Sequence, residues 1–356
     1  MERVGRRDFL KVSAFRAWLF TCVVSGLYNA SKWTEYYLPL QLPPSETPEL
    51  VVPKPDSFLL AAAPDQSVYP PPTPEGINPF SDFPIIHLFF NENGLYRERT
   101  MRAITNVVTD GKMPMISLDP AQAKDGVFRF GRDTDNYLAS IRPFLAWLNS
   151  LNSPVLLRTF YEMNGNWTIY GSQVNKPQDF VEGYKKFVTE IRRVVPKAKT
   201  ILSVNGGIPF EEYFPPDDFI DIAGIDTYNK FRMIPFGAMF YPNPSFEEAV
   251  FPDIARIQRL TSKPIMITET NIADQSRRLE WFRRGIAISP SLKNVIGLGG
   301  FFYDKSDLGV PNEADWDMTH DKVAWDTLCK EIVNNPTVFK PKGPIRFADF
   351  NRYLKQ

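Results

Sequence analysis

The chain has 356 residues, of which 43% are hydrophobic and 23% charged, so it is long enough to bury a sizeable core. Its 41 lysines and arginines equal its 41 aspartates and glutamates, which leaves no net charge to attract nucleic acid or a polyanionic partner. Two cysteines and two histidines in no ligand spacing argue against a thiolate cluster or a histidine-ligated metal. We therefore expect no metal, no cofactor and no nucleic-acid partner, and we expect a monomer.

The first thirty residues are typical of an export signal. Paired arginines in Gly5-Arg6-Arg7-Asp8-Phe9-Leu10-Lys11 resemble the twin-arginine signal of bacteria, and residues 14–27 form an apolar stretch shorter than a membrane span. Residues 31–56 are rich in proline, which favours an extended linker. We expect a signal segment over 1–30, a linker over 31–56 and a periplasmic or extracellular protein. An uncleaved segment that tethers the chain to the membrane and an ordinary buried helix are the alternatives.

Beyond the linker, short apolar runs alternate with segments of helical period. The stripe of Phe180, Tyr184, Phe187, Ile191 and Val194 is typical of a helix with one buried face. Eight runs read as strands, namely 58–62, 85–90, 113–118, 155–160, 200–204, 220–225, 264–268 and 295–302. This alternation predicts an α/β fold, a single (β/α)8 TIM barrel over residues 57–356, with an open doubly wound sheet as the competing layout.

The fourth run ends in charged and polar residues. Strict alternation along a strand would place Arg158, Phe160 and Glu162 on one side, directed toward the mouth of the barrel. Active sites of such barrels lie at the carboxyl ends of the strands. A charged pair at this position is therefore a candidate for chemistry.

The seventh run ends in the same way. Alternation places Glu269 on the face of Ile265 and Ile267, and the fourth and seventh strands lie across the mouth from each other. Two carboxylates that face each other are what the hydrolysis of a glycosidic bond requires. Glu162 and Glu269 are therefore the candidate catalytic residues.

The segments around both glutamates resemble glycoside hydrolase family 26, the β-mannanase family. Residues 157–167 are similar to its acid/base segment, 263–270 to its nucleophile segment, and 224–229 to the end of its sixth strand. The resemblance implies a retaining double displacement, with Glu269 as nucleophile and Glu162 as general acid/base. In such enzymes the two carboxyls stand about 5 to 5.5 Å apart, and the acid is kept protonated by its surroundings.

The resemblance also implies a set of substrate-binding residues. These are Arg158, Tyr161, Asn164, Trp167, Tyr170, Asp226, Tyr228, Phe302 and Tyr303. Arg158 would favour the ionised form of Glu269, or form a structural ion pair in the barrel. Tyr228 would donate a hydrogen bond to Glu269. Trp167 and Tyr170 would be sugar platforms or pack in a lid, and Asn164 and Asp226 would bind hydroxyls.

Three positions depart from the family pattern. Tyr161 stands where the family has histidine, Asp119 stands in place of glutamate, and Phe301, Phe302 or Tyr303 replaces a tryptophan. These changes affect contacts with sugar and leave the carboxylate pair intact. We therefore expect an endo-acting hydrolase of a β-linked polysaccharide, which could be mannan, mixed-linkage glucan or xylan. A non-catalytic carbohydrate-binding barrel and a transglycosylase of polysaccharide assembly are the alternatives.

Overall fold

The computed structural model describes residues 47–64, 68–70, 78–121, 125–151, 153–229, 244–305 and 315–355. The predicted signal segment and the first part of the predicted linker lie outside these residues. No helix in the part of the chain described here is long and apolar enough to cross a membrane.

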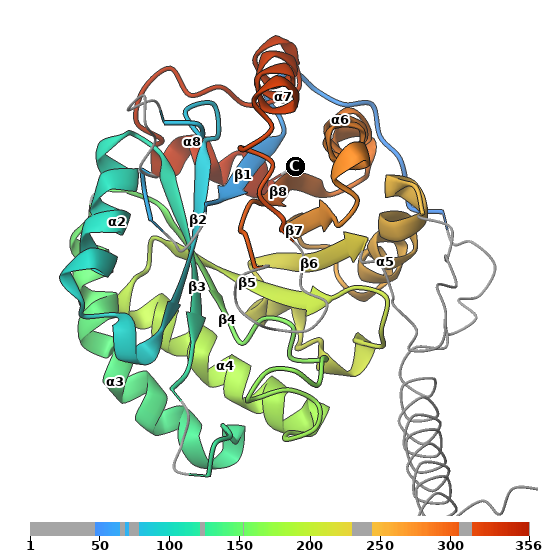
Figure 1. Cartoon of the computed structure of the whole chain (residues 1–356). Helices are drawn as coiled ribbons and strands as arrows, with labels where there is room; N and C mark the ends of the chain where they lie inside the picture. Colours follow the sequence, from blue (N-terminus) through green and yellow to red (C-terminus); the bar gives the residue numbers. More distant parts are fainter. Residues whose placement is uncertain are drawn as a thin grey trace, which may run out of the picture. The chain divides into compact units, whose positions relative to one another are not determined.

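Eight parallel strands close into a barrel in which each strand pairs with the next and β1 pairs with β8 (Figure 1). The strands are β1 (Leu59–Ala63), β2 (Ile85–Asn91), β3 (Met113–Asp119), β4 (Val155–Thr159), β5 (Ala198–Asn205), β6 (Ile222–Asn229), β7 (Ile265–Ile272) and β8 (Val295–Phe301). Each coincides with a predicted run to within a few residues. The predicted (β/α)8 barrel is confirmed, and the open sheet is excluded.

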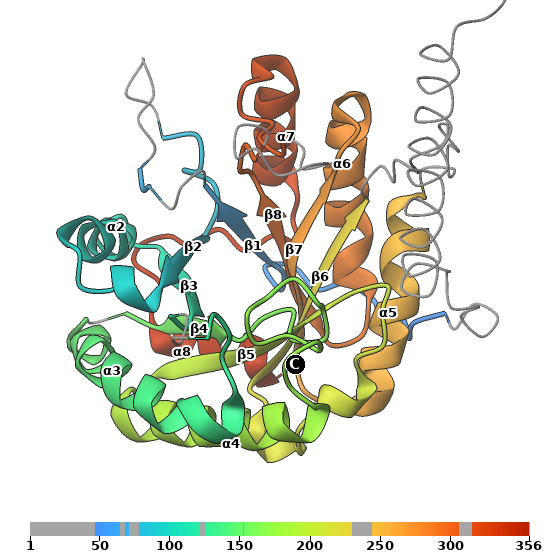
Figure 2. The same cartoon turned by 60° about the horizontal axis from the view of Figure 1, so that its bottom comes forward.

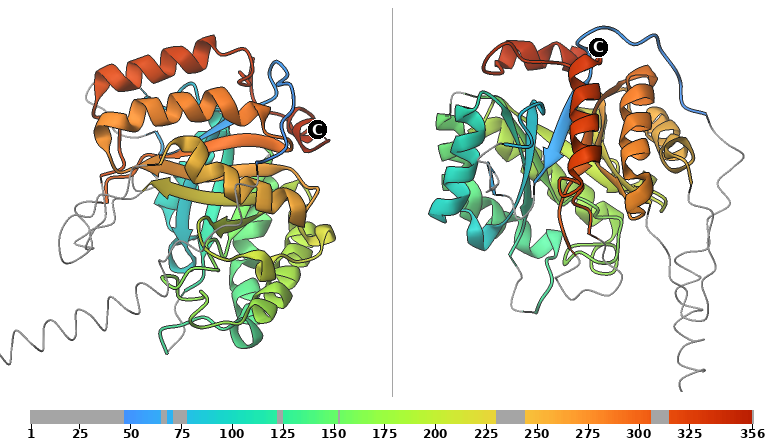
Figure 3. Two further views of the ribbon diagram at one scale, coloured as in Figure 1. Left: turned by 90° about the vertical axis from the view of Figure 1, so that its right-hand side faces the viewer. Right: turned by 45° about the horizontal axis from the view of Figure 1, so that its top comes forward.

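Helices surround the strands (Figure 2). They are α2 (Glu98–Thr109), α3 (Phe130–Ser150), α4 (Pro177–Val194), α5 (Phe246–Leu260), α6 (Arg278–Ile288), α7 (Lys322–Asn334) and the short α8 (Phe347–Asn351). The apolar stripe of α4 is buried as predicted except at Val194, which is partly buried, and Pro177 occupies the first turn, where no amide donor is needed. Helix α5 begins with a capping box between Ser245 and Glu248. Helices α6 and α7 run side by side (Figure 3).

The core has an outer and an inner layer. The outer layer lies between strands and helices, whereas inward residues such as Met115, Leu156, Ile201 and Met266 fill the lower barrel. Residues from the C-terminal segment, including Phe350, pack against the inner layer. The inner layer therefore gives the strands a rigid base.

The inward positions above this apolar layer are polar. Alternation along the strands continues from Ile85 to His87, from Met115 to Ser117, from Leu156 to Arg158 and from Ile201 to Ser203. All four polar side chains are buried. Because buried polar groups must find partners, the upper barrel has to contain a connected hydrogen-bond network.

The end of the predicted linker lies against the barrel. Glu49 forms an ion pair with Lys293, and Leu50 forms a β-bridge with Leu292, just before β8. The amide of Val51 donates to the carbonyl of Ser291 over 2.7 Å. The described chain thus joins the barrel near the amino ends of the strands.

Candidate active site

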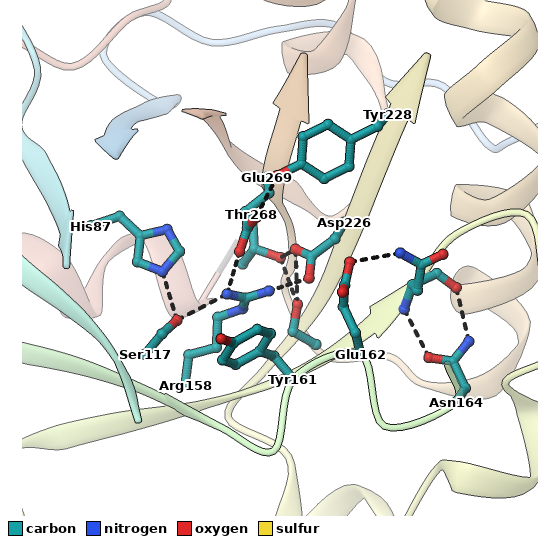
Figure 4. Close-up of polar contacts among 12 residues, drawn as sticks. His87, Ser117, Arg158, Tyr161, Glu162, Asn164, Asp226, Tyr228, Thr268 and Glu269 are labelled. Carbon is teal, nitrogen blue, oxygen red and sulfur yellow. Dashed lines mark hydrogen bonds and ion pairs between the residues drawn. The ribbon is translucent and has the colours of Figure 1, made fainter. Parts of the chain in front are cut away.

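Arg158 is the centre of the polar network in the upper barrel. It extends inward from β4, is fully buried, and donates to Glu269 Oε1 and to Asp226 Oδ2 (Figure 4). A third bond of 2.9 Å joins Arg158 Nη1 to Ser117 Oγ, and the Tyr161 ring lies 4.2 Å from the guanidinium carbon. Burial alone would lower the pKa of Arg158, but its two carboxylate partners raise it above the usual value. The guanidinium therefore remains charged and neutralises part of the acidic cluster.

Glu269 reaches this network because β7 pairs irregularly with both β6 and β8. Ile265 and Ile267 pack in the outer layer, so strict alternation would also have turned Glu269 outward. Register shifts after Ile225 on β6 and between Ile267 and Thr270 on β7 interrupt the alternation. The predicted common face of Ile265, Ile267 and Glu269 was therefore wrong, because Glu269 is directed inward. Irregular strand pairing of this kind commonly occurs beside active sites.

Two neighbours complete the surroundings of Glu269. Tyr228, at the end of β6, donates its hydroxyl proton to Glu269 Oε2. Thr268 donates to Asp226 Oδ1 over 2.7 Å, so adjacent residues of β7 bind different parts of the Arg158 network. Glu269 itself is only 6% exposed. Its carboxylate is thus held by donors on both oxygens.

Glu162 lies on a turn beyond β4 rather than on the strand. Phe160 and Glu162 have φ angles of 54° and 52°, which are unfavourable for residues with a side chain. The turn directs Phe160 into the outer core, where its ring lies 4.9 Å from that of Phe130, so the predicted common side with Arg158 was wrong. The Glu162 amide donates to the Ser203 carbonyl over 2.9 Å, which anchors the turn to β5.

The Glu162 carboxylate accepts two hydrogen bonds. Trp167 Nε1 donates to Oε2 and Asn205 Nδ2 donates to Oε1, both over 2.6 Å. Burial raises the pKa of Glu162, the negative charge of Glu269 raises it further, and the two hydrogen bonds lower it. The net direction is upward, in agreement with an acid that keeps its proton. The two glutamates therefore sense each other electrostatically across the mouth.

The two predicted sugar platforms differ in exposure. Trp167 is 49% exposed, so part of its indole ring remains accessible for stacking. Tyr170 is 2% exposed, and its hydroxyl lies 3.0 Å from the Tyr161 carbonyl and 3.1 Å from Asp119 Oδ1. A buried ring cannot stack on a sugar, so the platform interpretation of Tyr170 is corrected to packing. Tyr161 also donates to Asp119, over 2.8 Å.

The two predicted hydroxyl-binding residues are occupied by other groups. Asn164 accepts from the Asn205 amide over 2.9 Å and donates to the Asn205 carbonyl over the same distance. Asp226 is fully buried beneath Arg158. The prediction that Asn164 and Asp226 bind substrate hydroxyls is therefore corrected. Asn164 instead positions Asn205 beside Glu162, and Asp226 positions Arg158.

The end of β8 divides its aromatic residues between two sides. Phe302 packs outside the barrel, with ring centroids 5.1 Å from Phe282 and 5.0 Å from Trp325, so its predicted contact with substrate is corrected. Phe301 lies on the mouth side, 5.9 Å from the Tyr303 ring in a stacked arrangement. Tyr303 is partly exposed and remains a candidate for contact with substrate.

Several site residues were not predicted as such from the sequence. They are His87, Ser117, Asn205 and Trp316. The first three share a detectable signal, because each is a polar residue at an inward position of an otherwise apolar strand. Trp316 packs against Tyr228 from a distant loop and carries no such signal. Among the described residues, no group of three or more His, Cys, Asp or Glu side chains is arranged to hold a metal.

Known proteins resemble the part of the chain that contains this site. Residues 125–284, which include both glutamates, match the family model described as glycosyl hydrolase family 26. Endoglucanase H from Acetivibrio thermocellus is 23% identical over 222 residues, which are 59% of this chain and 23% of that protein. The chain thus corresponds to about a quarter of the length of this relative.

Solved structures share the fold at low sequence identity. A family 26 β-mannanase from Bacteroides ovatus superimposes with a TM-score of 0.58 at 15% identity, covering 82% of this chain and 92% of that one. An endo-β-1,4-mannanase from Cellulomonas fimi gives a TM-score of 0.54 at 14% identity, covering 84% and 74%. The predicted resemblance is confirmed: residues 125–284 match the model of glycosyl hydrolase family 26, and the barrel shares its fold with solved structures of that family.

Proposed function

We propose that this protein is a glycoside hydrolase that cleaves a β-linked polysaccharide by a retaining double displacement. Glu269 attacks the anomeric carbon while the bond to the leaving oxygen breaks, and Glu162 gives its proton to that oxygen. Water then attacks the same carbon, Glu162 accepts a proton from the water, and Glu269 is released. Over the whole cycle Glu162 gives up one proton and takes one back.

The observation that carries this proposal is the electrostatic coupling of the two glutamates. The charge of Glu269 contributes to the raised pKa of Glu162, after burial. When Glu269 becomes an ester it loses that charge, so the pKa of Glu162 should fall at the stage where a base is needed. One residue can therefore act first as acid and then as base.

The surroundings of Glu269 favour its role as nucleophile. Arg158 and Tyr228 donate to different oxygens, so the carboxylate is held in a fixed orientation. Preorganised donors of this kind reduce the reorganisation that accompanies a change of charge during reaction. Trp167, whose indole is tied to Glu162 and half exposed, is placed to contact the leaving-group sugar.

Chemical rescue with azide tests the two roles separately. Glu162→Ala and Glu269→Ala should each abolish cleavage, and azide should restore turnover of an activated aryl glycoside in both variants. In Glu162→Ala, azide attacks the glycosyl–enzyme ester and gives a product of retained configuration. In Glu269→Ala, azide occupies the place of the nucleophile and gives an inverted product.

Glu212→Gln is the matched control, because Glu212 is exposed and lies outside the network. It should keep wild-type turnover. Full activity in Glu162→Ala or Glu269→Ala, or the same product configuration from both rescued variants, would contradict the proposal. Binding of polysaccharide without any release of reducing ends from wild-type protein would instead indicate a carbohydrate-binding barrel.

For the substrate, we propose β-1,4-mannan first and β-glucan second. The mannanases among the similar solved structures support mannan, and the Acetivibrio relative, an endoglucanase, supports glucan. A panel of mannan, mixed-linkage glucan and xylan, assayed for reducing ends, separates these choices. Products of intermediate length early in the reaction would support endo action.

We also propose that the protein is exported, which the motif Gly5-Arg6-Arg7-Asp8-Phe9-Leu10-Lys11 supports. Replacement of Arg6 and Arg7 by lysine should leave the enzyme in the cytoplasmic fraction. Unchanged export of that variant would refute twin-arginine transport.

A further inference from the structure

A buried histidine lies behind the ion network and has no role in the proposed reaction. His87 is 1% exposed, and its Nε2 atom lies 2.7 Å from Ser117 Oγ (Figure 4). The same oxygen lies 2.9 Å from Arg158 Nη1. Three strands, β2, β3 and β4, thus contribute one residue each to a continuous chain that leads to Glu269.

The numbers of donors and acceptors favour one direction of hydrogen bonding in this chain. Arg158 can only donate, so it uses a lone pair of the Ser117 oxygen and leaves the serine proton for another partner. Burial lowers the pKa of His87 well below its usual range, and the charge of Arg158 lowers it further, so the imidazole is neutral. A neutral imidazole with its proton on Nδ1 offers Nε2 as the acceptor for the Ser117 hydroxyl.

The neighbours of His87 are consistent with this assignment. Phe89 packs on the imidazole at a centroid distance of 4.2 Å, and Ser117 is its hydrogen-bond partner. The positive charge of Arg158 lowers the pKa of His87. A protonated His87 would place a second cation beside Arg158 without a carboxylate of its own.

We propose that His87 is a positioning residue that acts through Ser117 to fix the rotation of the Arg158 guanidinium. The two hydrogens of Arg158 Nη1 go to Ser117 and Glu269, while Nη2 binds Asp226. Because the guanidinium is planar, the Ser117 bond helps to determine how its other donors meet the two carboxylates. This role rests on the proposed function, since its benefit is the orientation of the nucleophile.

A double-mutant cycle tests whether His87 acts through Ser117. His87→Leu should lower kcat about tenfold with little change in KM, because misorientation affects the reaction more than binding. His87→Gln, which keeps an acceptor, should recover most of the lost kcat. Ser117→Ala and the double variant Ser117→Ala/His87→Leu should have equal kcat values, because the effect of His87 is lost with its intermediary.

Thr200→Val is the matched control for a lost buried hydroxyl, since Thr200 is fully buried on β5 and bonds to Asp221. It should lower the melting temperature without changing kcat. Additive losses in the double variant, or equal kcat values for His87→Leu and His87→Gln, would overturn the proposal. Either result would indicate that His87 serves packing alone.

A measurement independent of activity examines the hydrogen-bond direction. The chain has only two histidines, so long-range 1H–15N spectra of wild type and His320→Ala identify the His87 signals. We expect a neutral imidazole protonated on Nδ1 from pH 8 to pH 5, and a change of its 15N shifts in Ser117→Ala. An Nε2-protonated or charged ring would overturn the assignment. Absence of glycosidase activity in wild type would refute the proposed function and leave this spectroscopic result unaffected.

Discussion

Replacing Arg158 by methionine should destabilise the protein strongly at neutral pH. The substitution keeps the length of the side chain but leaves Asp226 and Glu269 without their cation. Removing one partner of a buried ion pair costs roughly 3–5 kcal/mol, because the remaining charge stays desolvated. Thr268 and Ser203 still donate to Asp226, over 2.7 and 3.2 Å, but hydroxyls do not supply a compensating charge.

The loss should depend on pH in a direction that follows from proton linkage. The substitution removes the positive charge that lowers the pKa of Asp226, so burial should raise that pKa further in the folded variant. Between the unfolded pKa and this raised value the folded variant binds more protons than the unfolded chain. Its stability deficit relative to wild type should therefore shrink by about 1.4 kcal/mol per pH unit as the pH falls.

Urea unfolding followed by circular dichroism at pH 7, 6 and 5 measures this deficit. Arg283→Met is the matched control, because Arg283 is about half exposed and pairs with Glu331 on the surface. It should cost no more than about 1 kcal/mol and show little pH dependence. The reasoning would be refuted if Arg158→Met lost no more stability than this control at pH 7, or if its deficit stayed constant down to pH 5.

Three further substitutions separate chemistry from packing. Tyr228→Phe removes a donor to Glu269 and should lower kcat about 10²-fold, measured at saturating substrate; an unchanged kcat would exclude a role for the hydroxyl. Trp167→Phe removes a hydrogen bond that lowers the pKa of Glu162, so the alkaline limb of the pH–rate profile should move to higher pH, and a move to lower pH would contradict the assignment. Phe302→Ala should cost roughly 3–5 kcal/mol of unfolding free energy with KM unchanged, whereas a raised KM would return Phe302 to the substrate site.

The barrel could be predicted because its strands are apolar on both faces. Runs that are buried between an inner and an outer layer stand out from the amphipathic helices that separate them. The positions of Glu162 and Glu269 at strand ends followed from the same pattern together with the family resemblance. The directions of their side chains did not follow from this pattern, because Phe160 adopts a left-handed conformation and the pairing around β7 is irregular. Both departures depend on neighbouring strands, which a hydrophobic pattern does not encode.

The roles of several aromatic and amide residues could not be predicted from the sequence either. Tyr170 and Trp167 lie three residues apart near one turn, yet one is buried and the other half exposed. Phe301 and Phe302 are adjacent and lie on opposite sides of the barrel wall. Asn164 was expected to meet substrate, whereas it holds the backbone of Asn205, which itself binds Glu162. Such assignments depend on which groups lie next to each other in the folded chain, and the sequence alone does not give these contacts.

The bonds among β4, β6 and β7 form a closed circuit, from Arg158 to Asp226, on to Thr268, along the backbone to Glu269, and back to Arg158. A circuit of this kind resists sliding of any one strand relative to the other two. Among the described residues, those that follow the ends of these three strands are outside the circuit, so they can change in sequence without displacing Glu269. Under the proposed function, the architecture lets substrate preference diverge while the proposed nucleophile keeps its place.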